Sequence, residues 1–574
     1  MTSPLDDLTT ATVHLLAQGS VERIYGPPGT GKSTTLKGMI RDVVAEHGTE
    51  SVLVTSFTVT AAKSLAGMDL PLPERQVGTL HSAAYRAIGT PDVALDAKVL
   101  KDWNSRVRAD WRITSDGRRG SPDNVGDMGP GGDGGDELIA AYDMARSQLI
   151  PVGDMPAAVR EFAQHWEGWK RDTGAIDFTD MIQVALVRAM DGERAPGSPK
   201  VIISDEAQDM TPLETALVLA WGAHAERTVL ALDDDQAIMG WRGGNADPIL
   251  SLGTGLDGGP QLGVDITDRV LDQSWRIPAS LHTVAQTWIE LCSHRRDKPY
   301  RPRDVDGQTY SVSHPIESMR TAEAIARDAH AGRQVMVIAA CEYMLRVLVS
   351  NLRKLGVPFA NRYRPLEGRW NPLRAAKGMT TAERLFRYLV LDERALGDRA
   401  RLWTGDDVRA WLELVRTDAG LARGAKTAMK MLPAGELSIA QVEALFASED
   451  ALIRATEPEL GWLLESVANK YADKIGYPAE VARAHGPAAL MDPAPVTVGT
   501  IHSVKGGQAD VVYLCPSVSG AGWGEWVRGG RARDHTVRQF YVGLTRAKET
   551  CVVLGSTERH IPDGVLCPRE MEVR

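Results

Sequence analysis

The sequence predicts an α/β fold in which parallel sheets are covered by helices on both faces. The first observation is an apolar segment at Val21–Tyr25, followed by a glycine-rich loop at Gly26–Ser33 and a helical pattern at Thr34–Val44. The second is that further short apolar segments alternate with helical patterns along the chain. Such alternation is typical of parallel sheets, because a parallel connection needs a crossover helix. With 574 residues, the chain is too long for one core, so we expect several domains.

The composition is that of an ordinary globular protein, with 24% charged and 43% hydrophobic residues. The net charge of −10 argues against a uniformly basic nucleic-acid binder, although a motor can confine positive charge to one groove. The five cysteines form no C-x-x-C pair, which favours reduced thiols. No signal peptide is recognisable, and no apolar run approaches the roughly 18 residues of a membrane span. We therefore expect a cytoplasmic protein without a membrane partner.

The loop after the first strand reads G-P-P-G-T-G-K-S and fits the phosphate-loop pattern G-x-x-x-x-G-K-[ST] without a mismatch. Backbone N–H groups of such a loop surround a phosphate, and the helix N-terminus adds positive potential. Lys32 would reach the β- and γ-phosphates, and Ser33 would hold Mg²⁺. The alternative is a chance glycine-rich turn. The expected nucleotide-binding residues are Gly26, Pro27, Pro28, Gly29, Thr30, Gly31, Lys32, Ser33 and Thr34.

Acidic residues follow a predicted buried strand at Val201–Ser204. Ligands of open parallel sheets bind at the carboxyl ends of the strands, where Asp205 and Glu206 would lie. Asp205 would orient Mg²⁺, and Glu206 would position or deprotonate the attacking water. The alternative is a solvated acidic helix start. Other strands of this sheet are predicted at Ser51–Ser56, Gln76–Thr79 and Thr228–Leu232.

Polar residues also follow the strand at Thr228–Leu232, where the chain reads D-D-D-Q and then G-W-R-G-G. Gln236 could contact a phosphate without neutralising it. Trp241, between glycines, could be an exposed platform on which a base stacks. A core or hinge aromatic is the alternative for Trp241.

Two mainly helical segments interrupt this pattern. In the first, tryptophans at 103, 111, 166 and 169 lie in helical stretches, and a Gly/Asp-rich segment at 115–135 is predicted to be a disordered loop. After a helix at Ala279–Leu291, a second sheet is predicted, with helices at Thr321–His330 and Tyr343–Leu355. The second helical segment would follow, with a core of Leu385, Trp411, Leu412, Leu445 and Trp462. The second-sheet strands are Thr309–Ser313, Gln334–Ile338, Val496–Thr500, Val511–Cys515 and Thr550–Leu554, and the helices of the second segment are Glu383–Leu391, Asp407–Arg416, Ala440–Ala447 and Glu459–Tyr471.

Two motifs follow near the end of the chain. Val498–Gly507 places a threonine, a histidine and a lysine at the end of a strand. Val537–Lys548 is predicted to be an apolar helix that carries Arg546, which could reach a bound phosphate as an arginine finger does. The alternative for Arg546 is an ordinary solvated helix cation.

Taken together, these segments resemble superfamily 1A helicases, the UvrD/PcrA/Rep family, from Gly26 to Lys548. The matching segments occur in the family order. They are G-P-P-G-T-G-K-S (motif I), S-F-T-V-T-A-A from Ser56 (Ia), G-T-L-H-S from Gly78 (Ib), D-F-T-D from Asp177, D-E-A-Q-D from Asp205 (II), Asp233–Gly243 (III), Gln273–Ile277 (IV), Val498–Gly507 (V) and Gln539–Lys548 (VI).

The resemblance implies two RecA-like parallel-sheet P-loop NTPase domains, each with a mainly helical insertion. The first would comprise 1–88 and 174–266 with its insertion at 89–173. The second would comprise 267–360 and 490–574 with a reduced insertion at 361–489. ATP with Mg²⁺ would lie between the domains. The implied activity is ATP-dependent 3′→5′ translocation on single-stranded DNA with duplex separation, in repair, replication or recombination. We expect single strands and single-strand/duplex junctions as partners, and a monomer in isolation.

The same resemblance assigns roles to residues of the matching motifs. Lys32, Glu206, Gln236, Arg276 and Arg546 would be catalytic, the last three as γ-phosphate contacts, and Trp275 would stack near the adenine. The implied nucleic-acid contacts are Phe57, Thr79, His81, Met239, Trp241, Arg242, Thr500, His502 and Lys505.

Some residues depart from the family pattern. Thr9 stands where the family has an adenine-reading Gln, and Thr34 stands where an Arg often follows the phosphate loop. We therefore hypothesise relaxed nucleotide choice. A translocase with weak unwinding, a nucleotide-switched DNA-binding or remodelling factor, and an RNA motor are alternatives that the sequence leaves open.

Overall fold

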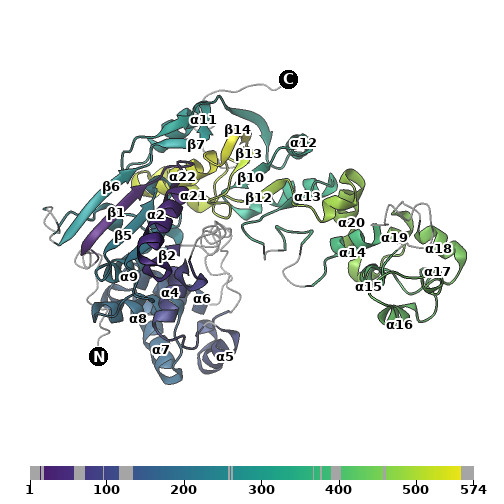
Figure 1. Cartoon of the computed structure of the whole chain (residues 1–574), viewed down its shortest axis with the longest axis horizontal. Coiled ribbons are helices and arrows are strands. Elements are labelled where there is room, and N and C mark those ends of the chain that lie inside the picture. The colour runs from purple at the N-terminus through teal and green to yellow at the C-terminus, as the bar shows by residue number, and fades with distance from the viewer. Residues whose placement is uncertain are drawn as a thin grey trace. The chain divides into compact units, whose positions relative to one another are not determined.

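The computed structural model describes residues 13, 18–56, 72–94, 96–114, 134–255, 259, 261, 263–365, 368–374, 378–389, 403–456 and 460–556. The chain divides into two compact units (Figure 1). Unit 1 comprises Met1–Tyr310, Val518–Cys551 and Arg559–Arg569, and unit 2 comprises Ser311–Ser517, Val552–Glu558 and Glu570–Arg574. None of the helices in the described ranges is long and apolar enough to cross a membrane.

Unit 1 is built on a six-stranded sheet of order β3-β2-β4-β5-β1-β6, in which every neighbouring pair is parallel. This confirms the α/β prediction and the strands expected in this part of the chain. The edge strand β6 was not predicted, because its residues are mostly exposed and follow a glycine-rich stretch. The strands are β1 (Gly19–Tyr25), β2 (Val52–Ser56), β3 (Val77–Thr79), β4 (Val201–Asp205), β5 (Arg227–Leu232) and β6 (Val264–Val270).

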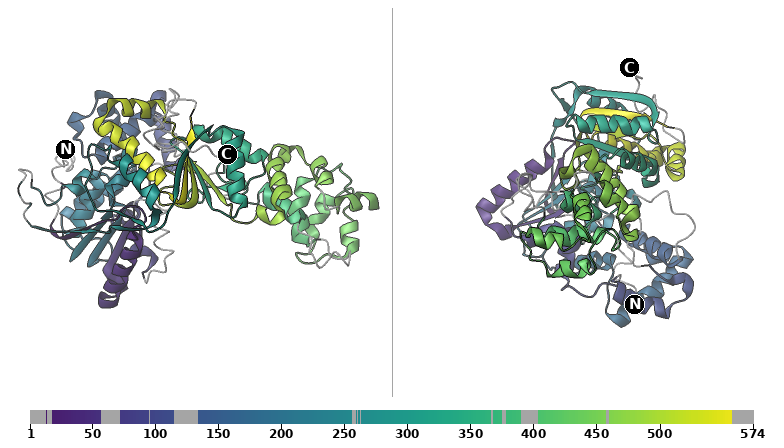
Figure 2. Two further views of the ribbon diagram at one scale, coloured as in Figure 1. Left: turned by 90° about the horizontal axis from the view of Figure 1, so that it is seen from above. Right: turned by 90° about the vertical axis from the view of Figure 1, so that its right-hand side faces the viewer.

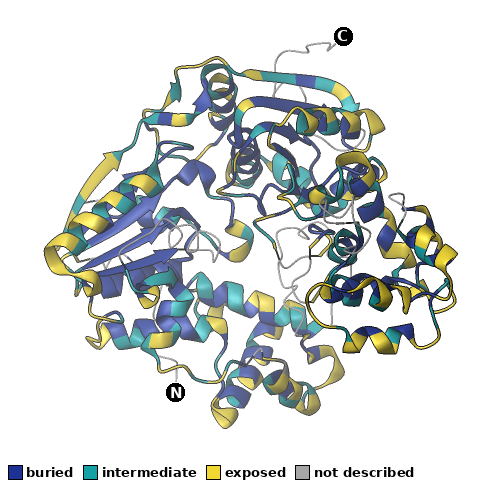
Figure 3. Cartoon of the chain, turned by 45° about the vertical axis from the view of Figure 1, so that its right-hand side comes forward, coloured by how far each residue is buried: buried dark blue, intermediate teal, exposed yellow. Residues whose placement is uncertain are grey.

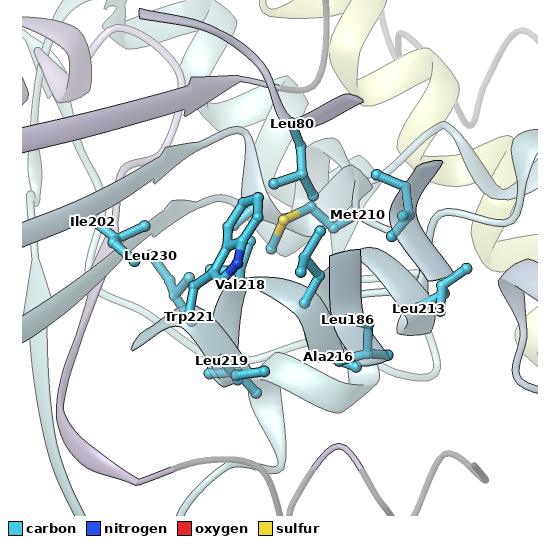
Figure 4. Close-up of a cluster of buried hydrophobic side chains, with 14 of the residues drawn as sticks. Leu80, Leu186, Ile202, Met210, Leu213, Ala216, Val218, Leu219, Trp221 and Leu230 are labelled. Atoms are coloured by element: carbon cyan, nitrogen blue, oxygen red, sulfur yellow. The ribbon is translucent and has the colours of Figure 1, made fainter. Parts of the chain in front are cut away.

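Helices cover both faces of this sheet, as its buried central strands require. Along β4, Ile202 packs in a core with α4, α8 and α9, whereas Val201 and Ile203 pack in another core with α2. Figure 4 shows the first core around Trp221. Figure 3 shows the central strands buried, while the covering helices expose residues on their outer sides. The helices are α2 (Lys32–His47), α4 (Leu80–Ala87), α8 (Phe178–Met190), α9 (Pro212–Gly222) and the short α10 (Asp247–Leu250).

The first helical insertion has its own aromatic core. Trp103 and Trp166 meet edge to face with ring centroids 4.9 Å apart, and Trp111 and Trp169 belong to the same cluster. Residues 115–133 of the predicted loop lie outside the described residues. The prediction of a disordered loop is wrong at residues 134–135, because α6 begins at Gly134. Gly135 is packed closely there, since a Cβ at this position would lie 2.2 Å from the Arg112 carbonyl oxygen. The helices are α5 (Ala97–Arg106), α6 (Gly134–Ser147) and α7 (Ala157–Thr173).

A second six-stranded sheet has the order β11-β12-β10-β13-β14-β9, and it confirms the strands predicted in the second half of the chain. A small parallel pair, β7 with β8, was not predicted. The strands are β7 (Gln273–Pro278), β8 (Arg301–Arg303), β9 (Gln308–Pro315), β10 (Val335–Ala339), β11 (Phe359–Ala360), β12 (Val496–Thr500), β13 (Ala509–Leu514) and β14 (Ala547–Gly555), and the neighbouring helices are α11 (Ala279–Ile289), α12 (Met319–His330), α13 (Arg346–Lys354), α21 (Gly520–Arg528) and α22 (Gly530–Leu544).

The second helical segment belongs to unit 2 and forms a separate group of helices there (Figure 2). Its predicted core residues are all buried, Leu385 and Trp411 completely. The helix predicted at Glu459–Tyr471 is wrong, because Val467 forms a β-bridge with Val415 and separates α19 from α20. The helix predicted at Asp407–Arg416 is shorter and continues as a 3-10 turn. The helices are α14 (Thr381–Leu389), α15 (Gly405–Trp411), α16 (Ala425–Ala428), α17 (Ile439–Glu443), α18 (Glu449–Ala455), α19 (Gly461–Glu465) and α20 (Asn469–His485).

Candidate nucleotide-binding site

The glycine-rich loop connects the end of β1 to the start of α2. Its glycines at 29 and 31 have φ angles of 76° and 84°, a left-handed conformation that L residues rarely adopt. Gly26 N–H donates to the Leu232 carbonyl at 2.9 Å, which fixes the loop to the end of β5. The Thr30 hydroxyl donates to the Pro27 carbonyl at 2.8 Å and closes the turn. The loop therefore has the backbone geometry that presents N–H groups to an anion.

Lys32 begins α2 and contacts both acidic residues that follow β4. Its Nζ lies 2.8 Å from Glu206 Oε1 and 3.6 Å from Asp205 Oδ1. Burial opposes its charge, but Glu206 and Asp205 outweigh that effect and raise the pKa of Lys32. Burial also raises the pKa of Asp205, against the attraction of Lys32. The three predicted residues thus form one charge cluster at the loop, in which Asp205 is buried and Lys32 and Glu206 are partly exposed.

Hard oxygen donors suitable for Mg²⁺ are present at this cluster. Ser33 is the second residue of α2, and Asp205 accepts a hydrogen bond from Glu206 N–H at 3.0 Å. A hydroxyl and a carboxylate beside a phosphate loop are oxygen donors of the kind that this cation prefers. Ser33 and Asp205 therefore fit a magnesium–nucleotide complex.

Glu206 has a left-handed backbone, with a φ of 56°. This conformation is strained for a residue with a side chain and is typical of functional sites. Lys32 holds one carboxylate oxygen of Glu206, and Gln208 Nε2 donates to the other at 2.6 Å. The carboxylate of Glu206 is thus fixed from both sides.

Gln236 and Arg546 meet although they are far apart in the sequence. Arg546 Nη2 donates to Gln236 Oε1 at 2.8 Å, and Gln236 Nε2 donates to Asp233 Oδ2 at 2.6 Å. The helix predicted to carry Arg546 ends at Leu544, and Arg546 lies in the turn before β14. Its exposed fraction is 1%, so the alternative of a solvated cation is wrong. Arg276 approaches the same turn, with Nη1 3.5 Å from the Thr545 carbonyl oxygen.

Strand β7 and the segment after α11 donate hydrogen bonds to backbone carbonyls of the phosphate loop. The hydroxyls of Ser274 and Tyr300 donate to the Pro28 carbonyl at 2.9 and 2.7 Å. Trp275 N–H donates to the Gly29 carbonyl at 2.8 Å, while its side chain is 71% exposed. Trp275 thus presents an open ring beside the loop. Ser274 and Tyr300 were not predicted as site residues, because neither lies in a motif that binds phosphate by itself.

A buried ionic clamp joins the end of β5 to the segment after α11. Lys298 Nζ lies 3.3, 2.7 and 2.8 Å from carboxylate oxygens of Asp233, Asp234 and Asp235. Arg295 donates to both oxygens of Asp235 at 2.8 Å. Burial, opposed by Lys298, raises the pKa of Asp233 to about 6. This clamp was not predicted, because nothing in the sequence around Arg295 and Lys298 indicates that they pair with the aspartates after β5.

Several predicted nucleic-acid contacts lie near α4 in unit 1. Thr79 caps α4, and His81 Nδ1 lies 3.5 Å from Glu214 Oε1. Burial lowers the pKa of His81, Glu214 opposes this, and the nearby Arg242 lowers it further. Phe178, which was not predicted, is 52% exposed and meets the His81 ring edge-on at 6.4 Å. A single aromatic residue in D-F-T-D did not indicate a nucleic-acid contact, so Phe178 was not predicted as one.

The remaining predicted contacts differ in exposure. Arg242 is exposed and Trp241 is partly buried, whereas the side chain of Met239 is 6% exposed and faces the interior. Met239 therefore does not offer a contact surface here, because residues 239–244 fold back through the hydrogen bond from Gly244 N–H to the Met239 carbonyl. Phe57, like Thr9, lies outside the described residues.

Thr500, His502 and Lys505 lie in unit 2, at the end of β12. Thr500 Oγ1 accepts from Ser503 N–H at 3.2 Å, and Asn361 Nδ2 donates to the Ser503 hydroxyl at 3.1 Å. Thr500 and His502 are buried, and Lys505 is partly exposed. These residues form a well-packed strand end, and Lys505 is the one with accessible charge among the three.

The D-F-T-D segment has a clear structural role. Asp177 caps α8 and accepts from Arg146 at 2.7 Å, Lys170 at 2.8 Å and Trp166 at 3.0 Å. Burial opposes the charge of Asp177, but the two cations outweigh it and lower its pKa. The nearby carboxylates of Glu167 and Asp180 complete an acidic group of the size that could hold a metal, but Arg146 and Lys170 already neutralise it. The cluster therefore joins the insertion to α8.

Comparison with known proteins agrees with the site. No curated protein matches the chain. Residues 9–242 match the family model of an AAA domain, a domain found in UvrD/Rep-type helicases and other P-loop NTPases. The match includes the phosphate loop and the acidic pair at 205–206, so the chain contains a P-loop domain of the kind that binds and hydrolyses nucleoside triphosphates.

Proposed function

We propose that this protein is an ATP-driven DNA motor, a 3′→5′ helicase or translocase that moves on single strands. The observation that carries the proposal is the meeting of Gln236 and Arg546 at 2.8 Å, in the same unit as the phosphate loop. The contact joins the end of β5 to a turn distant in the sequence, where both side chains could respond to a γ-phosphate. A nucleotide contacted by two parts of a site closes that site, and hydrolysis of the nucleotide opens it again.

The residues have separate roles in this proposal. Lys32 would leave Glu206 to bind the β- and γ-phosphates, and Ser33 and Asp205 would hold Mg²⁺, which supplies charge neutralisation on the phosphates when it is bound. Glu206, freed from Lys32, orients and deprotonates the attacking water. Gln236, Arg276 and Arg546 stabilise the charge that develops on the γ-phosphate.

Trp275 is the proposed platform for the base. Its exposed ring beside Gly31 can stack on any base, which supports relaxed nucleotide choice. GTP should then support more than about a tenth of the ATP rate at saturation, a preference of less than roughly 1.4 kcal/mol. A lower GTP rate would contradict relaxed choice without affecting the motor proposal.

Phe178, His81 and Arg242 are the proposed beginning of a single-strand track on unit 1. An exposed aromatic, an imidazole and an exposed guanidinium are suited to stacking on bases and pairing with phosphates. Stacking is indifferent to sequence, as a motor requires. Trp241 would extend the track on unit 1. In unit 2, His502 and Lys505 are separate proposed contacts with the nucleic acid. DNA repair, replication or recombination, a cytoplasmic location and a monomeric state remain part of the proposal.

The test is ATP hydrolysis with and without single-stranded DNA, with Lys32→Ala as the blank. We expect DNA to stimulate the wild-type rate strongly, and we expect strand displacement on a duplex with a 3′ single-stranded tail. Stimulation by RNA alone would favour an RNA motor. Stimulation without strand displacement would favour a translocase, and hydrolysis that ignores both polymers would overturn the motor proposal.

A further inference from the structure

Gln208 connects two parts of the site that the motif assignments treat separately. It is completely buried in the 3-10 turn after β4. Its amide Nε2 donates to Glu206 Oε2 at 2.6 Å, and its Oε1 accepts from Asp233 N–H at 3.0 Å. The reverse orientation of the amide would place oxygen against a carboxylate and NH₂ against N–H. The two contacts therefore determine its orientation.

These contacts complete a chain of hydrogen bonds across the site. Lys32 contacts Glu206, Glu206 accepts from Gln208, and Gln208 accepts from Asp233 N–H. Asp233 in turn accepts from Gln236, which accepts from Arg546. All of these residues belong to unit 1, and most are at most a tenth exposed. The general base and the arginine of the proposed mechanism are thus joined through neighbouring strands β4 and β5.

We propose that Gln208 is a positioning residue that holds Glu206 in its reactive orientation and links this orientation to Gln236 and Arg546. This inference rests on the proposed function, because it assigns Glu206 as the general base. Once Lys32 moves to the phosphates, Glu206 loses the partner at Oε1 while Gln208 continues to hold Oε2.

Two variants of Gln208 and one control variant test the two hydrogen bonds. Gln208→Leu removes both. Gln208→Glu keeps an acceptor for Asp233 N–H but replaces the donor to Glu206 by a negative charge. Gln76→Leu is the matched control, because Gln76 is also a buried glutamine in unit 1 and its amide donates to Glu50 instead of a site residue.

We expect Gln208→Leu to lower kcat about 10- to 100-fold, the effect of losing a hydrogen bond to a charged group, with KM for ATP within about threefold of wild type. Gln208→Glu should lower kcat at least as much. Gln76→Leu should keep the wild-type kcat. A merely structural role of Gln208 would weaken ATP binding together with kcat, instead of lowering kcat alone.

A double-mutant cycle tests the link to the other strand. If Gln208 and Gln236 act in one chain, Gln208→Leu combined with Gln236→Ala should lower kcat much less than the product of the two single effects. Independent effects would overturn the link. Unchanged kcat in Gln208→Leu, or a loss of kcat accompanied by an equal loss of affinity for ATP, would overturn the positioning role.

The same assays distinguish this inference from the proposed function. Wild-type protein that does not hydrolyse any nucleoside triphosphate would overturn both. If the wild type hydrolyses ATP and both Gln208→Leu and Gln208→Glu have the same kcat as the wild type, the inference alone would be overturned. Should Gln208→Leu fail to bind a fluorescent ATP analogue, Gln208→Glu, which preserves the shape of the side chain, decides the outcome.

Discussion

Three glycines near the phosphate loop allow steric contact and backbone strain to be measured separately. A Cβ at Gly29 would lie 2.4 Å from Arg276 Cβ and 2.8 Å from Ser274 Oγ, and φ is +76°. A Cβ at Gly31 would have Trp275 Cδ1 as its nearest contact, at 3.9 Å, with φ +84°. A Cβ at Gly38, inside α2, would meet nothing within 4 Å. Gly29→Ala therefore combines clash and strain, Gly31→Ala has strain alone, and Gly38→Ala has neither.

The expected free energies follow from these contacts. Left-handed backbone costs an L residue about 1–2 kcal/mol, and overpacking costs about 1–3 kcal/mol. Gly29→Ala should thus lower the free energy of unfolding by about 2–5 kcal/mol and Gly31→Ala by about 1–2 kcal/mol. Gly38→Ala should raise it by about 1 kcal/mol, because alanine is the better helix former.

Urea unfolding and titration with a fluorescent ATP analogue measure the two consequences. Gly29→Ala should also weaken nucleotide binding most, since β7 must move away from the loop and takes Trp275 with it. Gly38→Ala should bind as wild type does. Equal stability of Gly29→Ala and Gly31→Ala would refute the contact between β7 and the phosphate loop.

Three further predictions concern other parts of unit 1. Arg546→Ala should lower kcat roughly 1,000-fold, and adding Gln236→Ala should cost little more, because the first change already breaks their contact; additive losses in single-turnover hydrolysis would contradict this. Asp177→Asn should lower the free energy of unfolding at pH 7 by about 1.5–3 kcal/mol, because it removes one of the carboxylate charges that Arg146 and Lys170 share, while Asp180 still contacts both. Since the folded pKa of Asp177 is lowered, this contribution is present above its unfolded pKa of about 3.9 and is lost as pH falls below it, so urea unfolding of wild type and variant should converge in acid. Phe178→Ala should weaken single-stranded DNA binding by about 1–3 kcal/mol in fluorescence anisotropy without changing DNA-free hydrolysis, and unchanged affinity would remove Phe178 from the track.

Most strands of the two large sheets were predictable because they are short apolar runs, as expected of strands buried on both faces. Strand β6 was missed since Val264–Val270 is mostly exposed, and β7 was missed because Gln273–Ile277 was interpreted as a motif alone. The break between α19 and α20 depends on a tertiary pairing of Val467 with Val415, which helix periodicity does not record.

The candidate site was predictable where a short sequence motif with fixed spacing has one known chemical role. Lys32, Ser33, Asp205 and Glu206 follow from the phosphate loop and a strand end. For Arg546, its own segment left a phosphate contact and a solvated cation both open, and only the resemblance favoured the phosphate contact, because nothing in the segment indicates that Arg546 is 1% exposed and bonded to Gln236.

Apart from Phe178, the site residues that were not predicted have a common property: they act on neighbouring residues instead of on a ligand. Ser274 and Tyr300 donate to one carbonyl of the phosphate loop, and Lys298 binds the acidic residues after β5. Such contacts have no fixed spacing, because either partner can come from any element that reaches the site. Asp233 shows why they matter, since it accepts from Gln236, pairs with Lys298 and donates its N–H to Gln208. A change at this one buried carboxylate would therefore disturb the clamp, the general base and the arginine contact together, although the motif alone describes it as one of three adjacent aspartates.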